Sequence, residues 1–397
     1  MKTLLITSCF LPLILAAQNS GQNYWQTGYY GVVGSGAQTP SLIPWSKYTN
    51  VNHFSASPAP DCTIDTTLVV RQIAAFVGAA HDNGSKALIS ILDGLPGVYL
   101  NCTNADYIYT FVNNIVNFVT VHDYDGVDLD WEQVPNSYPS YINQYNDLIT
   151  RLRDAMPGKI ITMAAYWNSP GHAIELVAST SQSKLDRVNI MCYDMDVNGK
   201  TYTWFVDALW QAGETDKDAC DAQVFSFLSR GLARNKINIG FPFYGRIFPN
   251  VIGPGVVRPP LSTTTVHYRN LVNDKVRWQD NYKRYDLKHG ATYLSIPLLN
   301  EFVTYGGEEM IEKLVDWVKT QDFGGIMTFS VPHEFLSDQT GDARYPLSTL
   351  IHKGLFGDDA PVDTTDANQP VADRSRRKHP RGKSSVLKGV AAGAKQR

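Results

Sequence analysis

Eight short runs of apolar and β-branched residues alternate with longer amphipathic stretches along most of the chain. The runs predict strands at residues 29–33, 51–54, 86–92, 126–131, 160–165, 188–193, 237–241 and 325–329. Helical periodicity marks the stretches 66–81, 105–121, 141–156 and 307–320. Apolar strands that alternate with helices predict an α/β fold with a parallel sheet covered on both faces. Eight such units favour a closed (β/α)8 TIM barrel over an open doubly wound sheet, since no Gly-rich phosphate loop follows the first strand.

The interval between the seventh and eighth strands is longer than one helix requires. Residues 247–305 are rich in Pro, Gly, Thr and Tyr, which indicates a small inserted subdomain within a barrel of residues 18–356. Beyond that point the chain is rich first in Asp, Pro and Thr and then in Lys and Arg, without periodicity. We expect residues 357–397 to form a disordered tail that is basic at its end.

The N-terminus has the pattern of a secretory signal peptide. Lys2 precedes an apolar stretch over residues 4–15 that is too short to span a bilayer, and Ala16 and Ala17 offer small residues for cleavage. Removal of residues 1–17 predicts a secreted, extracellular protein. Nothing later in the sequence is apolar for the ~20 residues that a membrane-spanning helix needs.

Cysteines and glycosylation signals fit an exported chain. Cys9 leaves with the signal peptide, so four cysteines remain for an oxidising compartment, and three pairings are open. Cys62 and Cys102 follow the second and third predicted strands, in neighbouring loops on one face of a barrel, and theirs is the expected disulfide. N-glycosylation acceptor sequences begin at Asn83 and Asn101.

Charge is distributed unevenly along the chain. The formal net charge is −3, but the last 26 residues hold nine Lys and Arg and one Asp, which leaves 26 basic and 37 acidic residues in the rest. A nucleic-acid-binding protein would present a basic patch. The acidic body therefore argues against a nucleic-acid partner.

The fourth predicted strand carries three carboxylates at alternate positions. Because strand side chains alternate between faces, Asp128, Asp130 and Glu132 share one face, and the apolar residues between them share the other. The acidic face then points into the barrel, where burial of like charges should retain at least one proton. Such a cost is typical of a functional site. A cation site and a structural polar network are the alternatives, but no nearby set of His or Asn completes a metal shell.

These carboxylates belong to a series of segments that resembles glycoside hydrolase family 18, the chitinases. The segments follow the family's order and are Asp125-x-x-Asp128-x-Asp130-x-Glu132, Met191-Cys-Tyr193-Asp194, Gly240-Phe-Pro-Phe-Tyr244-Gly-Arg246 and Gly324-Gly-Ile-Met-Thr-Phe329. The resemblance covers nearly all of residues 25–356, and the acidic segment is its most specific part. Many chitinases carry a small α+β subdomain after the seventh strand, where residues 247–305 lie.

The resemblance implies retaining hydrolysis of β-1,4-linked N-acetylglucosamine chains, with the substrate's own acetamido group as the nucleophile. Glu132 would be the general acid and base, and neighbouring acids and partial burial raise its pKa in the direction this role needs. Asp130 would hold the acetamido N–H, Asp128 would share a proton with Asp130, and Tyr193 would orient the acetamido group. No cofactor and no metal are implied, and we expect a monomer that binds chitin or its oligosaccharides.

Six further residues are candidate substrate contacts: Met191, Asp194, Tyr244, Arg246, Phe329 and Trp167. An ion pair with a barrel acid is the alternative for Arg246, and packing against a loop is the alternative for Trp167. Cys192 lies between two inward-facing residues and should point outward. A buried thiol is the first interpretation of this cysteine, and a pair with Cys220 is the second.

The sugar-binding platform departs from the family pattern. The family's Ser-x-Gly-Gly on the third strand is replaced by a segment that ends in Leu92-Asp93, and its Trp on the eighth strand is replaced by Phe329. Aromatic residues expected after the first two strands fall on Val33 and near Pro58. Smaller aromatic surfaces predict weaker stacking on a sugar.

Two alternatives to a chitinase are considered. An endo-N-acetylglucosaminidase that acts on glycoprotein glycans shares the acidic motif, but the inserted region and the segment from Tyr244 to Arg246 favour the chitinase. A chitin-binding lectin or decoy with little turnover belongs to a different functional class. Family members of that type generally lose the acid, and Glu132 is present.

Overall fold

A computed structural model describes residues 23–31, 39–135, 138–196, 201–215, 217–257 and 263–358. The expected signal peptide, nearly all of the expected tail and Val33 lie outside these residues.

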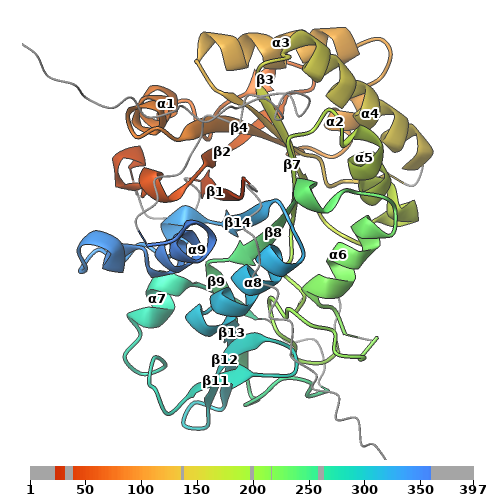
Figure 1. The fold of residues 1–397 in the computed structure, drawn as a ribbon. Coiled ribbons are helices and arrows are strands. Elements are labelled where there is room, and N and C mark those ends of the chain that lie inside the picture. The colour runs from red at the N-terminus through yellow and green to blue at the C-terminus, as the bar shows by residue number, and fades with distance from the viewer. Residues whose placement is uncertain are drawn as a thin grey trace, which may run out of the picture.

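Eight parallel strands form a closed barrel at the centre of the fold (Figure 1). The strands are β1 (Trp25–Gly31), β2 (Asn50–Pro58), β4 (Lys86–Leu92), β5 (Gly126–Asp130), β6 (Ile160–Ala165), β7 (Arg187–Ile190), β8 (Ile237–Pro242) and β14 (Gly325–Phe329). The barrel closes because β1 pairs with both β14 and β2, and the short β3 (Ile64–Asp65) adds antiparallel to β2. The predicted (β/α)8 fold is confirmed.

Helices surround the barrel (Figure 1). They are α1 (Ile73–Asp82), α2 (Val98–Cys102), α3 (Ile108–Val121), α4 (Tyr138–Ala155), α5 (Ala173–Ser181), α6 (Cys220–Leu228), α8 (Glu308–Thr320) and α9 (Pro346–Phe356). In α3, Phe111, Ile115 and Val119 recur every four residues and are fully buried, so one face of the helix packs on the barrel. The first strand begins four residues earlier than predicted, because Gln26 and Thr27 are polar yet fully buried and do not show in an apolar pattern.

The outward face of β5 packs against aromatic residues. Trp131 is 2% exposed, and its ring contacts those of Tyr99, Tyr141 and Tyr145 at centroid distances of 4.7, 4.5 and 5.2 Å. This cluster fixes the strand from the outside, so the alternate residues must face the barrel interior.

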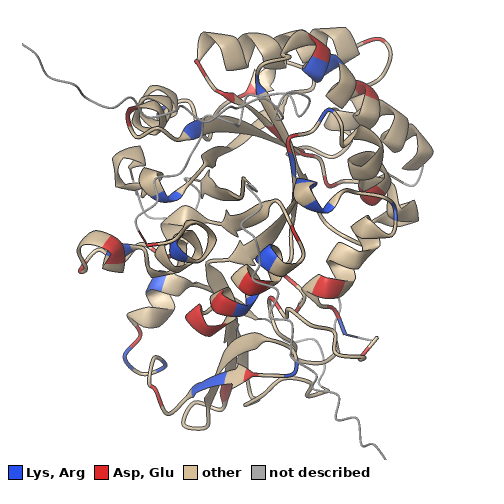
Figure 2. Cartoon of the chain, in the orientation of Figure 1, with Lys and Arg blue, Asp and Glu red and all other residues tan. Residues whose placement is uncertain are grey.

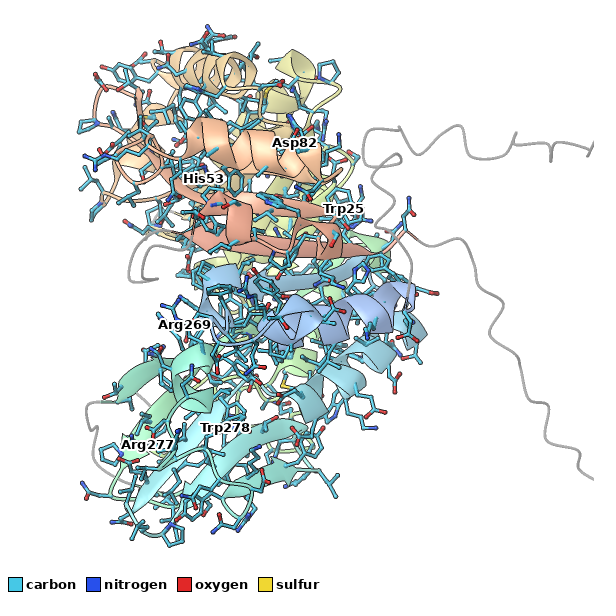
Figure 3. The ribbon with its side chains drawn as sticks, turned by 90° about the vertical axis from the view of Figure 1, so that its left-hand side faces the viewer. Trp25, His53, Asp82, Arg269, Arg277 and Trp278 are labelled. Carbon is cyan, nitrogen blue, oxygen red and sulfur yellow. A yellow bond between two sulfur atoms is a disulfide. The ribbon has the colours of Figure 1, made fainter. Side chains whose placement is uncertain are left out.

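The insertion between β8 and β14 is an α+β unit with its own five-stranded sheet, in the order β10-β9-β13-β12-β11. Its elements are β9 (Tyr244–Pro249), β10 (Thr264–His267), α7 (Tyr268–Val272), β11 (Lys283–Asp286), β12 (Ala291–Ile296) and β13 (Glu301–Tyr305). Figure 3 shows it as a lobe that contains Arg277 and Trp278, apart from the barrel strands around Trp25 and His53. The sheet begins at Tyr244, before the predicted start at residue 247, because β9 follows almost directly on β8.

The arrangement of the inserted sheet brings one of its strands to the mouth of the barrel. β9 lies between β10 and β13, so both of its edges are paired. Arg277 holds the far end of β13 through two bonds to Glu301, Nε–Oε2 at 2.8 Å and Nη2–Oε1 at 3.0 Å. The insertion therefore places Tyr244 and Arg246 rigidly beside the ends of the barrel strands.

Charged residues of both signs are interspersed over the helices and the insertion (Figure 2). The described part of the chain has no helix that is both long and apolar enough to cross a membrane.

Candidate active site

The three carboxylates of the acidic motif point inward and end at a cavity. Asp128 and Asp130 are buried on β5, and Glu132, two residues after the strand, is partly exposed. We call these three residues the ladder. Glu132 lines a cavity of about 700 Å³, together with Gln133, Tyr166, Trp167, Asn168, Met191, Tyr193, Asp194, Met195, Asp218 and Gln223. The cavity therefore lies beyond the carboxyl ends of β5, β6 and β7, where this fold carries its functional groups.

Asp128, at the inner end of the ladder, accepts four hydrogen bonds. Tyr29 and Ser90 donate to Oδ2 at 2.7 and 3.0 Å, and Thr162 and Asn189 donate to Oδ1 at 2.5 and 3.3 Å. Ser90 and Thr162 align with Asp128 in the registers of the two neighbouring strands. Burial raises the pKa of Asp128, and the side-chain donors oppose that rise. These contacts hold the Asp128 carboxyl in one orientation.

Asp130 and Glu132 are neighbours along the ladder and their carboxyl groups interact, so a proton bound by one affects the pKa of the other. Burial, followed by the charges of Glu132 and Asp128, raises the pKa of Asp130 well above its ordinary value. Burial, followed by the charge of Asp93, raises the pKa of Glu132. Both shifts favour the protonated form, which is the form that a general acid needs.

The sequence predicts a proton shared between Asp128 and Asp130. The charge of Asp128 contributes to the raised pKa of Asp130, and the sharing of the proton stays a prediction.

The segment after β7 forms the next part of the cavity. Tyr193 points its hydroxyl toward Met327 on β14, with Oη and Sδ 3.9 Å apart. Burial raises the pKa of Tyr193, followed by the charge of Asp194, so its hydroxyl stays protonated and can donate a hydrogen bond. A Cβ atom at Gly240 on β8 would lie 3.0 Å from the Tyr193 ring, so the glycine leaves room for this side chain.

Arg246 and Tyr244 both contact Asp194. Asp194 Oδ1 accepts from the Tyr244 hydroxyl at 2.9 Å and from Arg246 Nη2 at 2.7 Å. Arg246 Nε also lies 3.5 Å from Asp196 Oδ2, and Nη1 donates to Thr265. The ion pair that was the alternative for Arg246 is thus present, and it joins the insertion to the segment after β7.

An aromatic cluster lies beneath the opening of the barrel. The ring of Phe329 approaches those of Tyr29, Phe54 and Tyr193 at centroid distances of 5.8, 5.4 and 6.2 Å. Phe54 comes from β2, so this strand supplies an aromatic surface four residues before Pro58. The replacement of the family's Trp at residue 329 is therefore accompanied by three further rings.

One wall of the cavity is held from behind by α6. With its amide oriented to satisfy both neighbours, Gln223 accepts from Trp167 Nε1 at 2.8 Å and donates to the Met191 carbonyl at 3.2 Å. Three residues earlier, Cys220 forms a disulfide with Cys192. We use the name α6 wall for three parts together: the segment after β6 that carries Trp167, the segment after β7 that carries Met191, and the contacts that α6 makes with both. Trp167 is packed on the core and also lines the cavity.

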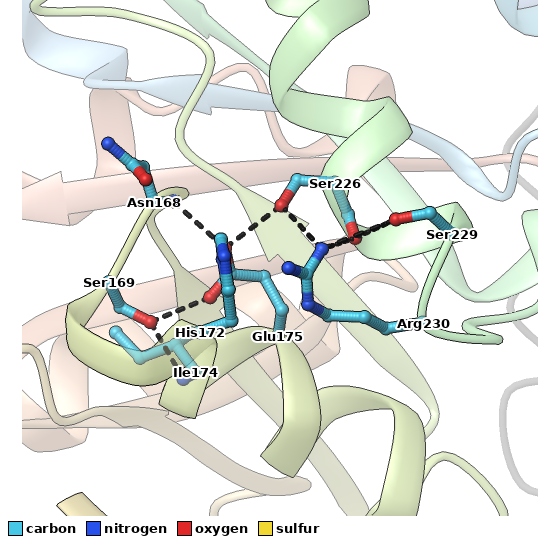
Figure 4. Close-up of polar contacts among 8 residues, drawn as sticks. All are labelled: Asn168, Ser169, His172, Ile174, Glu175, Ser226, Ser229 and Arg230. Atoms are coloured by element: carbon cyan, nitrogen blue, oxygen red, sulfur yellow. Dashed lines mark hydrogen bonds and ion pairs between the residues drawn. The ribbon is translucent and has the colours of Figure 1, made fainter.

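Glu175 anchors the loop that carries Trp167 (Figure 4). Its carboxylate is 0% exposed and accepts from the Asn168 N–H at 2.9 Å, the Ser169 hydroxyl at 2.6 Å and the Ser226 hydroxyl at 3.0 Å. His172 Nδ1 lies 3.2 Å from the same carboxylate. Ser226 belongs to α6, so this network joins the loop to the same helix.

Two disulfides lie near the ends of the strands. Cys62 bonds Cys102, the pairing expected from their loops. Cys192 bonds Cys220, so the first interpretation of Cys192, as a buried thiol, is wrong and the second holds. The helix that supplies Cys220 was not among the predicted ones, and its place against the segment after β7 follows only from the folded chain.

The other predicted sites are accessible positions. Asn83 and Asn101, the expected glycosylation acceptors, are both exposed. Across the described residues, no group of three or more His, Cys, Asp or Glu side chains is arranged to hold a metal ion.

Several residues of the site were not predicted. They are the donors to Asp128 on four different strands, the supports Gln223 and Glu175, and the lining residues Gln133, Tyr166, Asn168, Met195 and Asp218. Ser90, Thr162 and Asn189 left one signal, since each is a polar residue among apolar neighbours in its strand. Gln223 and Glu175 left no signal in the sequence, because their role depends on how α6 packs.

Comparisons with known proteins agree with this geometry. A family model described as glycosyl hydrolases family 18 matches residues 26–334. Chitinase 1 of Aphanocladium album is 26% identical over 63% of this chain and 60% of its own length. A chitinase-like effector of Moniliophthora perniciosa is 26% identical over 58% of this chain and 57% of its own length. The chain thus spans about 60% of the length of these relatives.

Solved structures share the fold. The group IV chitinase of Ostrinia furnacalis in complex with allosamidin superposes with a TM-score of 0.73 at 20% identity, over 84% of this chain and 98% of that structure. A family 18 chitinase from Cycas revoluta in complex with (GlcNAc)3 gives a TM-score of 0.68 at 19% identity, over 83% of this chain and 99% of that structure.

Proposed function

The chain belongs to glycosyl hydrolases family 18, and we propose that it cleaves β-1,4-linked N-acetylglucosamine chains by retaining, substrate-assisted hydrolysis. The observation that carries the proposal is the ladder, whose last carboxylate lies in a cavity of about 700 Å³. Relatives named chitinases and a chitinase fold neighbour with bound (GlcNAc)3 support the same substrate class.

Glu132 is the proposed acid. Its carboxyl protonates the glycosidic oxygen, and its raised pKa keeps the proton available to higher pH than an ordinary glutamate would. The acetamido oxygen of the sugar attacks the anomeric carbon, the leaving chain departs with the proton, and an oxazolinium ion forms. Glu132 then accepts a proton from water as that water opens the ion with retention.

Asp130 and Tyr193 are the proposed partners of the acetamido group. Asp130 Oδ1 has no hydrogen-bond partner within the described chain, and Asp130 is only 4% exposed. A substrate N–H would donate to this oxygen, and the Asp130 carboxylate would stabilise the positive charge of the oxazolinium ion. The Tyr193 hydroxyl orients the acetamido carbonyl, and Asp128 holds the inner end of the ladder.

The proposed substrate contacts are Phe329 beneath the reacting sugar and Trp167, Met191, Asp194, Tyr244 and Arg246 around the cavity. The chain would act as a secreted monomer without a cofactor, glycosylated at Asn83 and Asn101, and its basic tail beyond residue 358 would be dispensable for cleavage of soluble oligomers.

A second candidate is a chitin-binding protein with little turnover. The observation that favours it is the altered platform, in which Phe329 and Asp93 replace a Trp and a Gly of the family pattern. One relative carries the name chitinase-like effector rather than chitinase. The intact ladder favours the enzyme.

Measurement of both turnover and binding separates the two candidates. Reducing ends released from an N-acetylglucosamine hexamer and the hexamer Kd from calorimetry would be compared for the wild type, Glu132→Gln and the exposed Glu309→Gln control on α8. We expect Glu132→Gln to lower kcat by roughly 10²–10⁴-fold with little change in Kd, and Glu309→Gln to match the wild type. Binding without reducing ends from the wild type would contradict the enzyme and support the second candidate.

A further inference from the structure

Asp93 is a buried carboxylate directly after β4, beside the end of the ladder. It is 7% exposed and replaces a glycine of the family's Ser-x-Gly-Gly segment. Its own backbone N–H donates to the carbonyl of Asp130, the last residue of β5, at 3.0 Å. The residue therefore continues the pairing of β4 with β5 past the last paired residues, Leu92 and Asp130.

The side chain of Asp93 accepts hydrogen bonds from the backbone at Glu132, the proposed acid. Its Oδ2 accepts from the backbone N–H of Glu132 at 3.0 Å and from that of Gln133 at 2.5 Å. The Gln133 side chain donates back to the Asp93 carbonyl at 2.8 Å. Together with the bond to the Asp130 carbonyl, these contacts hold the backbone on both sides of Glu132. β5 has ended at this point, so hydrogen bonds between strands no longer hold the chain.

The charge of Asp93 also acts on the acid. After burial, it is the largest cause of the raised pKa of Glu132, ahead of Asp194, and it acts on Asp130 in the same direction. The other titratable groups near Glu132 are the side chains of Asp130, Asp194, Tyr141, Tyr166 and Tyr193. Arg246 pairs with Asp194, so the negative charge of Asp194 is partly offset.

We infer that Asp93 is a positioning residue for Glu132, which fixes the backbone beneath the acid and places a negative charge beside its carboxyl. This inference rests on the proposed function for its effect on turnover, although its effect on Glu132 itself does not require turnover. A turn cap with a structural role alone would share the two backbone bonds. It would have no influence on the titration of Glu132.

Two substitutions separate the backbone hydrogen bonds of Asp93 from its negative charge. Both backbone N–H groups bond the same oxygen, Oδ2, so Asp93→Asn keeps an acceptor in that place and removes the charge. Asp93→Ala removes both the acceptor and the charge. The matched control is Asp125→Asn at the other end of the same strand pair, where the carboxylate accepts the Ala87 N–H at 2.9 Å far from the cavity.

The first readout is the pH dependence of kcat and KM on the hexamer. Burial raises the pKa of Asp93 to about 6, so its charge is present above that pH. Loss of the charge lowers the pKa of Glu132, and the alkaline limb of kcat moves to lower pH by about one unit in Asp93→Asn. The profiles converge near pH 5. Asp93→Ala lowers kcat about 10- to 100-fold at all pH values with KM changed less than about threefold, and Asp125→Asn leaves the profile in place.

The second readout does not depend on activity. The Glu132 carboxyl is titrated by NMR in protein labelled with ¹³Cδ-glutamate, and its signal is identified by its loss in Glu132→Gln. We expect a lower pKa of Glu132 in Asp93→Asn than in the wild type and Asp125→Asn. An unchanged titration, or an Asp93→Ala variant with wild-type kcat, would overturn the role of Asp93. A wild type without turnover whose Glu132 still responds to Asp93→Asn would instead overturn only the proposed function.

Discussion

The ladder and the α6 wall border the same cavity but are held by different kinds of structure. Asp128 and Asp130 lie on one strand, fixed by its register and by donors from neighbouring strands. Trp167 and Met191 lie on segments after two other strands and are held by a helix that is 50 residues or more from Trp167 in the sequence. The proposed chemistry thus rests on the rigid sheet, whereas the proposed contact surface rests on tertiary links that can change without altering the barrel.

The difference predicts two separable phenotypes. A change in the ladder should lower kcat and alter the response to pH, because it affects protons and charge. A change in the α6 wall should raise KM or lower stability and leave the pH profile of kcat in place, because it affects the surface that a sugar contacts.

After Glu132→Gln, the largest expected effect comes from Asp130→Asn in the ladder. Loss of the carboxylate that we propose stabilises the oxazolinium ion should lower kcat by roughly 10²–10³-fold, measured by reducing ends from the hexamer. A smaller fall than that of a wall variant would contradict the assignment of chemistry to the ladder.

The same variant tests the electrostatics of the ladder. The folded-state pKa of Asp130 is raised, so the folded protein binds this proton more tightly than the unfolded chain does, and the contribution of Asp130 to stability declines as pH rises above about 3.9. Asp130→Asn removes this loss, so its Tm relative to the wild type increases from pH 4 to pH 7. A constant difference would show that the carboxyl is not held protonated.

The next effect is on stability and comes from the disulfide of the α6 wall. Replacement of Cys192 and Cys220 by serine opens a loop of 28 residues and lowers the free energy of unfolding by about 3.5 kcal/mol in the chain-entropy model. Because Cys192 lies between two cavity residues, KM should also rise. Replacement of Cys62 and Cys102, the matched control, should lower stability by a similar amount and leave KM unchanged.

Trp167→Ala should give a smaller effect on substrate binding. An aromatic stacking contact contributes about 0.5–1.5 kcal/mol to binding. Its loss therefore raises KM about 2- to 10-fold, with kcat changed less than about twofold. The control is Tyr109→Ala, an aromatic residue that is 64% exposed on α3. Equal KM values for both variants would remove Trp167 from the substrate contacts and leave the alternative, packing against its loop.

The smallest effect should come from Glu175→Gln. The amide keeps the shape of the buried carboxylate but loses one acceptor position, so one of its donors is less well satisfied and the protein loses about 1–2 kcal/mol of stability. The Tm should fall by a few degrees, with KM raised about twofold and the pH profile of kcat unchanged. A shifted pH profile would link the wall to the acid.

The same contrast explains how far the sequence predicted the molecule. Period-two alternation in residues 126–132 predicted the inward carboxylates, because a strand's two faces follow directly from residue order. Strands 86–92, 160–165 and 325–329 were predicted with their observed bounds, since each is a mostly apolar run bounded by polar or glycine-containing segments.

The wall could not be predicted in the same way. Gln223 and Glu175 are polar residues on short helices that had not been identified, and only the packing of α6 brings them to Trp167 and Asn168. Asp93 was identified as a departure from the glycine pattern, but its bonds to residues 132 and 133 depend on the register of β4 with β5. Tertiary register carries this information, and local periodicity does not.

The central claim, retaining hydrolysis with Glu132 as the acid, is tested most directly by the anomeric form of the first products. The wild type and Glu132→Gln would be incubated with N-acetylglucosamine hexamer, and new reducing ends would be followed by ¹H NMR before mutarotation. We predict β-anomeric products from the wild type and none above background from Glu132→Gln. First products in the α form, or equal cleavage by both proteins, would contradict the account.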